Sequence, residues 1–510
     1  MGMNFKQGIS REQISMMCPE SFIAPDNPVR VIDMFVELLD LPDLGFSNSK
    51  LGKEGRPPYE AKYLLKLFYY GYINRIRSSR KLEAECLRNV EVWWLIYQLA
   101  PSYHTIADFR KDNAAAFKKA FKLFVGFLKG EELFSGKVVA VDGTKIRAQN
   151  NKKNNFNEAR FAKSLEYIEA KVDEHIKELD QCDAREDKQA SELKKKDVAK
   201  KIEALKERKK EYEALSKKMV ESGEKQISLS DPESRSLPLS DVATAMCYNI
   251  EAVSDSKHGL IVEFETINTG DQGQLCPMTT KAKVALGVDE ITTLADKAFH
   301  VGKDLQDCKQ SGITTLVASP EKTNSNADAA YQPSAFVYDP ELNAYNCPQG
   351  ATLTTNGIAY EKIRKGRTSY SVQKYVTDQC LTCMARRLCT KGKRKEIERS
   401  EYQDVVDENN KRTEENKALY RQRPLIIEHI FGTVKRSWGY NYTLLKGLKK
   451  VNTEMSIIFT VYNIRRAMSI LGVKGLISKL KAAKEAKQAK KRGILNYYPL
   501  CCIMEHRLAA

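Results

Sequence analysis

The sequence predicts an α/β chain in which a mixed sheet carries the functional residues, with helices before and around it. Residues 138–141 (VVAV) and 291–295 (ITTLA) are short runs rich in β-branched residues, typical of buried strands, and each is followed by an aspartate. The first 130 residues have helical spacing, and residues 157–225 are rich in Lys and Glu. These features separate the sheet from a helical domain and a helical insertion.

Residues 1–130 are predicted to form a helical DNA-binding domain. Residues 59–86 place apolar side chains at helical spacing and then turn basic, at Arg75, Arg77, Arg80 and Lys81. A helical bundle with a solvated basic face is the alternative. The formal charge of +17 over 510 residues favours a polyanionic partner such as DNA.

Residues 157–225 predict two long amphipathic helices. Apolar residues recur at three- and four-residue steps from Leu165 to Leu179 and again from Val198 to Met219, and a polar segment separates the two runs. The pattern fits an antiparallel hairpin within the chain, and a coiled coil between chains is the alternative. No chemistry is assigned to this insertion.

The strand and helix signals continue in a regular order after residue 226. Residues 247–255, 259–268, 291–296 and 313–319 are expected to be strands, and residues 273–286 and 303–312 are expected to be helices. With the strand at 138–142 before the hairpin, this order is that of ribonuclease H-like domains. The expected fold is therefore a ribonuclease H-like mixed-sheet domain with a helical N-terminal domain.

Asp142 and Asp296 are the first two candidate catalytic residues. Each ends an apolar strand, and in such a sheet the two strands can be neighbours. Two adjacent carboxylates repel and raise each other's pKa unless a cation lies between them. Hard divalent ions such as Mg²⁺ prefer oxygen ligands. A turn or cap at a strand end is the alternative for either aspartate alone.

Glu428 is the third candidate. It lies in an apolar run that begins at Pro424, a residue favoured in the first turn of a helix. Lys435 follows seven residues later, which is two turns along the same face of a regular helix. A buried acid beside a lysine suits a phosphodiester site, because the acid completes a metal cage and the cation reaches a phosphate.

Five motifs in order resemble the bacterial insertion-sequence transposases of the DDE superfamily. They are the N-terminal segments FIAPDNPVRVID, GRPPYEAKYLLKLFYYGYINRIRSSRKLEAE and SYHTIADFRK, the strand VAVDGTKIRA, the segment SDPESR followed by CYNIEAVSD, the strand LADKAF, and YRQRPLIIEHIFGTVKR. The resemblance extends over nearly the whole chain.

The resemblance implies that Asp142, Asp296 and Glu428 bind two Mg²⁺ (or Mn²⁺) ions. It also implies that Tyr420, Arg423 and Lys435 are accessory, phosphate-binding residues. Arg423 stands five residues before Glu428, whereas the common form of the motif has four, and Pro424 occupies that place here. The implied activity is cleavage at the element's ends by two-metal hydrolysis, followed by joining of the 3′-hydroxyl ends to target DNA.

A cysteine cluster predicts a possible structural Zn²⁺ site. Cys380 and Cys383 have C-x₂-C spacing, Cys389 follows closely, and Cys347 lies on an expected facing strand. The adjoining basic run, Arg386, Arg387, Lys391, Lys393, Arg394 and Lys395, suggests that the insertion faces DNA. Four reduced cysteines in a β-rich insertion without metal are the alternative.

Residues 454–472 predict a helix that packs on the core, and its Glu454 is the rival for the third acid. Beyond it lies a lysine-rich tail that is expected to be solvated and to bind phosphate. The expected divisions are 1–130, 131–156 (first catalytic strand), 157–225 (hairpin), 226–320 (core), 321–415 (cysteine insertion), 416–475 (glutamate helix and core helix) and 476–510 (basic tail).

The composition limits location and partners. No apolar run is long enough to span a membrane, and the N-terminus lacks the apolar core of a signal peptide. We expect a cytoplasmic, nucleoid-associated bacterial protein that binds element ends and target DNA and acts as a homodimer or larger oligomer. A transposase-derived DNA-binding regulator and a ribonuclease H-like nuclease without joining activity remain the alternatives.

Overall fold

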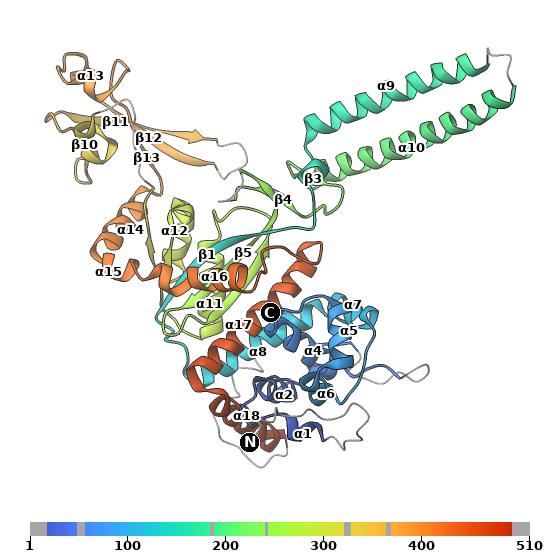
Figure 1. The fold of residues 1–510 in the computed structure, drawn as a ribbon. Coiled ribbons are helices and arrows are strands. Elements are labelled where there is room, and N and C mark those ends of the chain that lie inside the picture. Colours follow the sequence, from blue (N-terminus) through green and yellow to red (C-terminus); the bar gives the residue numbers. More distant parts are fainter. Residues whose placement is uncertain are drawn as a thin grey trace, which may run out of the picture.

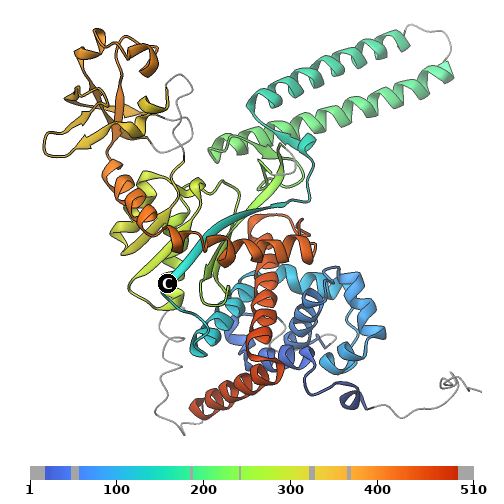
Figure 2. The same cartoon turned by 60° about the vertical axis from the view of Figure 1, so that its left-hand side comes forward.

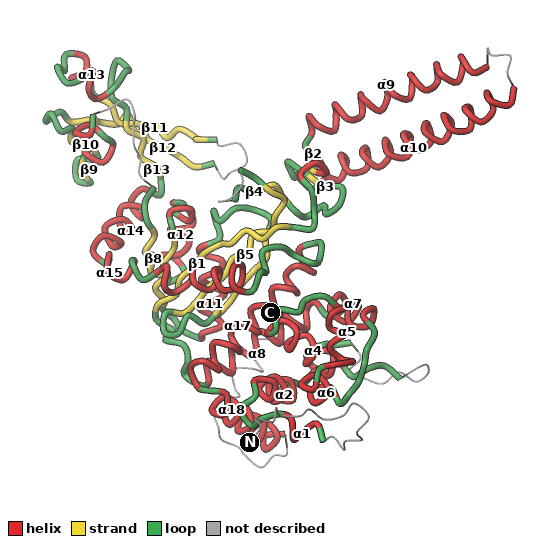
Figure 3. The backbone as a smooth tube through the Cα atoms, viewed as in Figure 1, coloured by secondary structure: helices red, strands yellow, loops and turns green. Residues whose placement is uncertain are grey.

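A computed structural model describes residues 18–47, 57–183, 188–239, 243–320, 328–363 and 369–491. Its centre is a six-stranded mixed sheet of order β4-β5-β1-β7-β8, in which β6 also pairs with β5 (Figures 1 and 3). The strands are β1 (Val138–Arg147), β4 (Arg235–Leu237), β5 (Ala245–Asp255), β6 (Ile261–Ile267), β7 (Ile291–Ala295) and β8 (Ile313–Val317). Strands β1, β7 and β8 run parallel, whereas β5 is antiparallel to its neighbours. The expected ribonuclease H-like mixed sheet is confirmed.

Helices cover both faces of this sheet. Val139 and Val141 of β1 share a core with α11 (Leu275–Leu286) and α12 (Gly302–Gln310) on one face. Ala140 and Ile146, which alternate with them, belong to a larger core with α17 (Leu448–Leu471) on the other face. Burial on both faces explains why β5 is apolar along most of its length rather than alternating.

The N-terminal region is helical, as expected. Its helices are α1 (Pro19–Phe22), α2 (Pro28–Leu38), α3 (Leu41–Leu44), α4 (Ala61–Ile73), α5 (Ser79–Arg88), α6 (Val90–Ile96), α7 (Tyr103–Asp112) and α8 (Ala114–Gly130). Helix α17 packs against α4 and α8, so one hydrophobic cluster runs from α2 through the helices to the sheet.

One residue of the predicted basic turn has a different role. Arg77 is buried and forms an ion pair with Glu454 of α17, with an N–O distance of 3.0 Å. It therefore cannot contact DNA from this position. Arg75, Arg80 and Lys81 remain exposed.

The helical insertion folds as a hairpin within the chain. Helices α9 (Glu158–Asp183) and α10 (Lys188–Glu221) pack antiparallel and project away from the sheet (Figures 1 and 2). Phe156, Phe161 and Tyr212 form an aromatic cluster near its root, beside the short pair β2 (Asn155–Phe156) and β3 (Ile227–Ser228). The predicted hairpin is confirmed.

The cysteine insertion is a separate five-stranded antiparallel sheet, as the predicted β-rich insertion requires. Its strands are β9 (Val337–Asp339), β10 (Ala344–Asn346), β11 (Thr352–Lys362), β12 (Tyr370–Val376) and β13 (Ile397–Ser400). A small core that includes Tyr345, Leu353 and Tyr375 holds it together. It projects from the core at a different corner from the hairpin (Figure 2).

The segment after the insertion returns to the core. It comprises α14 (Gln403–Glu415), α15 (Lys417–Tyr420), a π-helical turn η6 (Pro424–Glu428), α16 (His429–Gly432), a second π-helical turn η7 (Thr433–Ser437), α17 and α18 (Val473–Lys491). None of the helices in the described part of the chain combines the length and the apolar character needed to cross a bilayer.

The expectation of a solvated tail after residue 475 is wrong as far as Lys491. Helix α18 packs against α2, and its Leu476 and Leu480 are fully buried. Lys479 pairs with Glu131 and Lys484 with Glu37, so these lysines neutralise acids of the N-terminal helices. Residues 492–510 of the predicted tail lie outside the described part.

Candidate active site

Asp142 and Asp296 lie at corresponding positions of two neighbouring parallel strands. Ala140 of β1 pairs with Leu294 of β7, and each aspartate follows its member of this pair by two residues. Burial raises the pKa of Asp142 to about 6; the Arg423 guanidinium opposes this shift and the Asp296 carboxylate adds to it. The electrostatic coupling agrees with the register, so the sheet brings the two predicted aspartates together.

Backbone amides hold both carboxylates. The Gly143 N–H donates to Asp142 Oδ1 at 2.9 Å, and the Ala298 N–H donates to Asp296 Oδ1 at 2.8 Å. Asp296 thereby caps the short 3₁₀ helix η2 (Lys297–Phe299). Each aspartate thus has one oxygen held by the backbone.

Arg423 joins the third acid to the pair. Its Nη1 lies 3.3 Å from Asp142 Oδ2, and its Nη2 lies 2.6 Å from Glu428 Oε1. Asp296 also acts on the pKa of Arg423, so a single guanidinium lies within reach of all three acids. The Arg423 guanidinium therefore supplies a positive charge among the three carboxylates.

Glu428 is not buried, contrary to the expectation from its apolar run. Its side chain is 50% exposed, and Leu425 is exposed as well. Ile426, Ile427 and Ile430 take the buried face of the helix and anchor it on the core, so Glu428 points outward to Arg423. The carboxylate is therefore accessible to a ligand from solvent.

Tyr420 adjoins this group, at the end of α15. Burial raises the pKa of its hydroxyl; Arg423 opposes the shift and Asp296 adds to it. Tyr420 and Arg423 therefore lie close to the three acids.

Lys435 lies on η7 and is partly exposed. Its expected position two turns from Glu428 assumed 3.6 residues per turn. Because η6 and η7 are π-helical, with hydrogen bonds to the fifth residue, a turn takes more residues and a seven-residue step is no longer two whole turns.

Glu454 is committed elsewhere. Besides its ion pair with Arg77, its Oε2 accepts hydrogen bonds from the N–H groups of Leu444 and Leu445 at 2.8 and 3.3 Å. Both of its carboxylate oxygens are thus engaged, one by the N-terminal region and the other by the segment that precedes α17.

A second polar cluster lies on the opposite face of β1 and was missed by sequence reasoning. Glu251 of β5 faces Gly143, and Asn249 donates from Nδ2 to Glu251 Oε1 at 2.6 Å and to Asp271 Oδ1 at 2.8 Å. Lys145 Nζ lies 2.6 Å from Asp271 Oδ1. Burial, followed by the Asp271 charge, raises the pKa of Glu251 to about 9, so Glu251 is neutral at pH 7.

This polar cluster leaves little room for a side chain at Gly143. A Cβ at that position would come within 2.4 Å of Asp271 Oδ1 and 2.8 Å of Glu251 Oε1. The only sequence signal was the glycine directly after Asp142, since Glu251 lies in an otherwise ordinary strand. The polar cluster thus packs against the backbone of the strand that carries the first aspartate.

The donor set at the first site fits a divalent metal. Three carboxylates supply the hard oxygen ligands that Mg²⁺ and Mn²⁺ prefer, and Arg423 already compensates the same charges. Oxygens of Asp142, Asp296 and Glu428 are the groups that would hold it.

The four predicted zinc ligands gather in the insertion. Burial raises the pKa of the Cys389 thiol, and Cys347, Cys380 and Cys383 all lie close enough to act on it. The Gln349 N–H donates to Cys347 Sγ at 3.4 Å. No three of these sulfurs lie within 4.8 Å of one another, whereas Cys276, Asp304 and Cys308 of the core do so.

The core group of Cys276, Asp304 and Cys308 has a structural explanation. Asp304 accepts hydrogen bonds from the N–H groups of Leu275 and Cys276 at the start of α11, at 3.0 and 2.9 Å. Burial raises the pKa of the Cys308 thiol, so it remains protonated.

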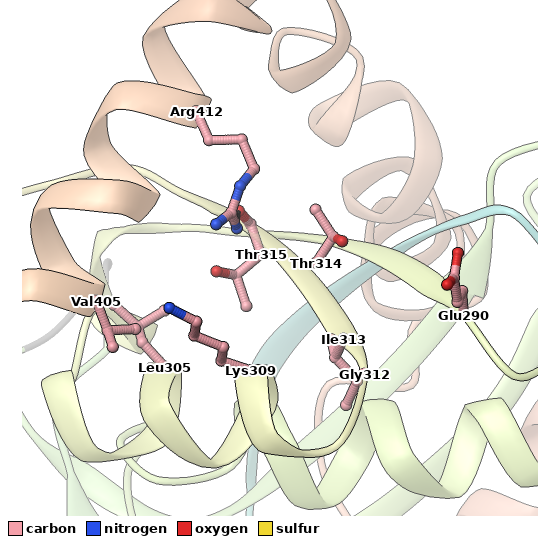
Figure 4. Close-up of a pocket in the computed structure, with 9 residues that line it drawn as sticks. All are labelled: Glu290, Leu305, Lys309, Gly312, Ile313, Thr314, Thr315, Val405 and Arg412. Carbon is pink, nitrogen blue, oxygen red and sulfur yellow. Dashed lines mark hydrogen bonds between the residues drawn. The ribbon is translucent and has the colours of Figure 1, made fainter.

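Two hollows lie away from the acids. A cavity of about 240 Å³ lies between α12, β8 and α14, where Arg412 donates to the Thr315 carbonyl at 3.1 Å (Figure 4). A groove of about 1880 Å³ separates the core from the cysteine insertion, and its lining includes Asp271 and Lys303. Neither lining includes a predicted catalytic residue.

Comparison with protein families gives two matches. Residues 346–468 match the family model described as "Transposase DDE domain", and residues 17–112 match "Transposase domain (DUF772)". The first range contains Glu428 and the four insertion cysteines, and the second contains the N-terminal helices. Searches of curated proteins and of solved structures returned no match.

The fold and the two matches support one class of protein, the DDE transposases with a ribonuclease H-like core. The N-terminal transposase domain, placed before that core, supports the insertion-sequence type within this class. Use of a divalent metal and binding of DNA go with this family.

Proposed function

We propose that the protein cleaves DNA at the ends of its insertion sequence and joins the freed 3′-hydroxyl ends to target DNA. The observation that carries this proposal is the convergence of Asp142, Asp296 and Glu428 around Arg423. Three carboxylates from two strands and a helix, with one exposed to solvent, suit a phosphodiester site.

Each residue of the site has a proposed role. Asp142 and Asp296, whose carboxylates accept hydrogen bonds from backbone amides, would supply metal ligands at the edge of the sheet, and Glu428 would complete the ligand set from the helix. Two Mg²⁺ or Mn²⁺ ions, when bound, supply activation of the attacking oxygen and stabilisation of the leaving oxygen. The protein itself needs no nucleophilic side chain, since positioning and charge stabilisation suffice for phosphoryl transfer.

Arg423 has a proposed double role. In the structure it neutralises Asp142 and Glu428; if these carboxylates held a metal, its guanidinium would be available to bind a phosphate in a bidentate manner. We propose that Tyr420 orients Arg423, and that Lys435 binds a phosphate further along the DNA.

The other modules have proposed roles in DNA binding and assembly. We propose that residues 1–130 contact DNA through Arg75, Arg80 and Lys81, that Cys347, Cys380, Cys383 and Cys389 bind a structural Zn²⁺, and that the active complex is a homodimer or larger oligomer. The net charge of +17 supports the role in DNA binding, and the gathered thiols support the zinc site. The expected place of action is the bacterial nucleoid.

The test uses purified protein, linear DNA that carries the ends of its element, and Mg²⁺. Asp142→Asn, Asp296→Asn and Glu428→Gln are each expected to abolish cleavage while DNA binding persists. Strand-transfer products support the full proposal, and cleavage without joining indicates a nuclease. A Glu428→Gln protein that still cuts contradicts the assignment of the third acid.

A further inference from the structure

The tip of the cysteine insertion exposes an unusual amount of apolar surface. Residues 380–389, called the knuckle here, include the end of a 3₁₀ turn, η5 (Asp378–Leu381), and the helical turn α13 (Arg386–Cys389). The side chain of Met384 is fully exposed, Leu388 is 55% exposed and Leu381 is 45% exposed. Three large apolar side chains within eight residues therefore face solvent.

The knuckle is also strongly basic. Arg386 and Arg387 lie between the exposed apolar residues, and the sequence has no acidic residue from 379 to 395. Arg387 is exposed, and the Nη1 of Arg386 donates to the Leu381 carbonyl at 3.5 Å. Lys391 and Lys393, which follow, are exposed as well.

Two members of the predicted basic run are used within the insertion instead. Arg394 forms an ion pair with Asp378 at 2.6 Å, and Lys395 is buried with its ammonium 5.2 Å from the centre of the Phe336 ring. Lys395 therefore cannot reach DNA. The cations that remain available are those that flank the exposed apolar residues.

The combination of exposed apolar side chains and exposed cations indicates which kind of partner the knuckle binds. Exposed apolar side chains are stabilised by removal from water, and an arginine-rich rim favours a polyanion. Duplex DNA offers both, because proteins insert Met or Leu between base steps while arginines bind the adjacent phosphates and minor groove. A second copy of this chain would bring like charges together at the same patch.

We propose that the knuckle docks on duplex DNA, with Met384 as a wedge at a base step, Leu381 and Leu388 beside it, and Arg386 and Arg387 on the backbone. The inference rests on the proposed function, in that it assigns a surface to the DNA. The insertion projects away from the sheet that carries the acids (Figures 1 and 2). The proposed contact is therefore with DNA at a distance from the bond that is cleaved.

The test measures binding of the full-length protein to a labelled DNA duplex of mixed sequence, in the absence of divalent metal. The duplex carries 2-aminopurine at a TA step, because such steps are easily unstacked. Met384→Ala is expected to weaken binding by roughly three- to tenfold and to abolish the 2-aminopurine signal, with an unchanged salt dependence. The double change of Arg386 and Arg387 to Ala is expected to flatten the slope of log Kd against log salt by about 2.

Leu342→Ala is the matched control. Leu342 is 69% exposed in the same insertion but lies beside Asp339 and Glu341, so its loss should leave DNA binding unchanged. Unchanged binding of Met384→Ala, or an equal loss in Leu342→Ala, overturns the inference. So does a change in sedimentation of Met384→Ala without a change in DNA affinity, since the patch then pairs copies of the chain. Loss of cleavage in the acid variants leaves this metal-free assay unaffected.

Discussion

At the residue scale, Arg423 organises the site. It touches Asp142 and Glu428 directly and acts electrostatically on Asp296 and Tyr420. Its position between strand and helix explains how Glu428 can be exposed yet aligned with a half-buried aspartate. The polar cluster behind Gly143 adds a second layer, because Glu251 and Asp271 pack against the other face of the same strand, and Lys145 of that strand pairs with Asp271.

Glu251→Gln is expected to stabilise the protein at alkaline pH. The pKa of Glu251 rises from 4.5 in the unfolded chain to about 9 in the fold. As pH rises between these values, the unfolded chain releases the proton and the folded protein keeps it, so stability falls. The penalty is on the order of 4 kcal/mol at pH 8 and below about 1 kcal/mol at pH 5, and a glutamine does not incur it.

Thermal unfolding at pH 5 and pH 8 checks this prediction. The midpoint of Glu251→Gln should rise relative to wild type at pH 8 more than at pH 5. Glu290→Gln, an exposed position before β7, serves as the control and should follow wild type at both values. A uniform shift at the two pH values would contradict the prediction.

Gly143→Ala is expected to destabilise the protein and to lower its activity. The added methyl group would overlap Asp271 and Glu251 at 2.4 and 2.8 Å, which displaces either the polar cluster or the strand that carries Asp142. Overpacking of this kind costs about 1–3 kcal/mol. Gly432→Ala in α16 meets nothing within 4 Å and should gain roughly 0.5–1 kcal/mol from helix propensity. Urea denaturation of the two variants should give opposite signs.

At the element scale, the insertion depends on its cysteines. Its sheet has a small core, and Cys389 is buried in it while Cys347 packs against it. If the four thiols bind Zn²⁺, metal binding supplies folding free energy to this module, as in other small zinc modules.

Cys383→Ser should therefore lose the metal and loosen only the insertion. Metal analysis of protein purified without added zinc should give about one equivalent for wild type, and limited proteolysis of the variant should cut between residues 321 and 415. Cys276→Ser in the core is the comparison and should keep the zinc. Wild type with far less than one equivalent, together with equal protease resistance of the variant, would refute the zinc site.

At the scale of the whole molecule, the N-terminal helices and the sheet share one core. Helix α17 lies between them, and the Arg77–Glu454 ion pair is buried in the contact. The N-terminal helices and the sheet domain are therefore packed together through a shared core, whereas the hairpin and the cysteine insertion project from it (Figure 2).

Glu454→Gln and Glu428→Gln should have opposite effects. Breaking the buried pair leaves Arg77 uncompensated and is expected to cost about 3–5 kcal/mol of stability, with cleavage retained at low temperature. Glu428 is half exposed, so its replacement should leave the melting temperature nearly unchanged while cleavage is lost. Calorimetry paired with a cleavage assay decides, and the reverse pattern would make Glu454 the third acid.

The sequence by itself determined the elements, because local patterns specify them: β-branched runs for the strands, three- and four-residue steps for the hairpin, and helical spacing for the first 130 residues. It also singled out Asp142 and Asp296, since a charge directly after an apolar strand stands out along one segment. What only the tertiary structure decided depends on contacts between distant segments. Arg77 pairs with Glu454, α18 packs on α2, and Glu251 lies opposite Gly143. A local sequence pattern cannot predict such partners, because they come from distant segments. The exposure of Glu428 was likewise decided by packing, because the neighbouring isoleucines took the buried face.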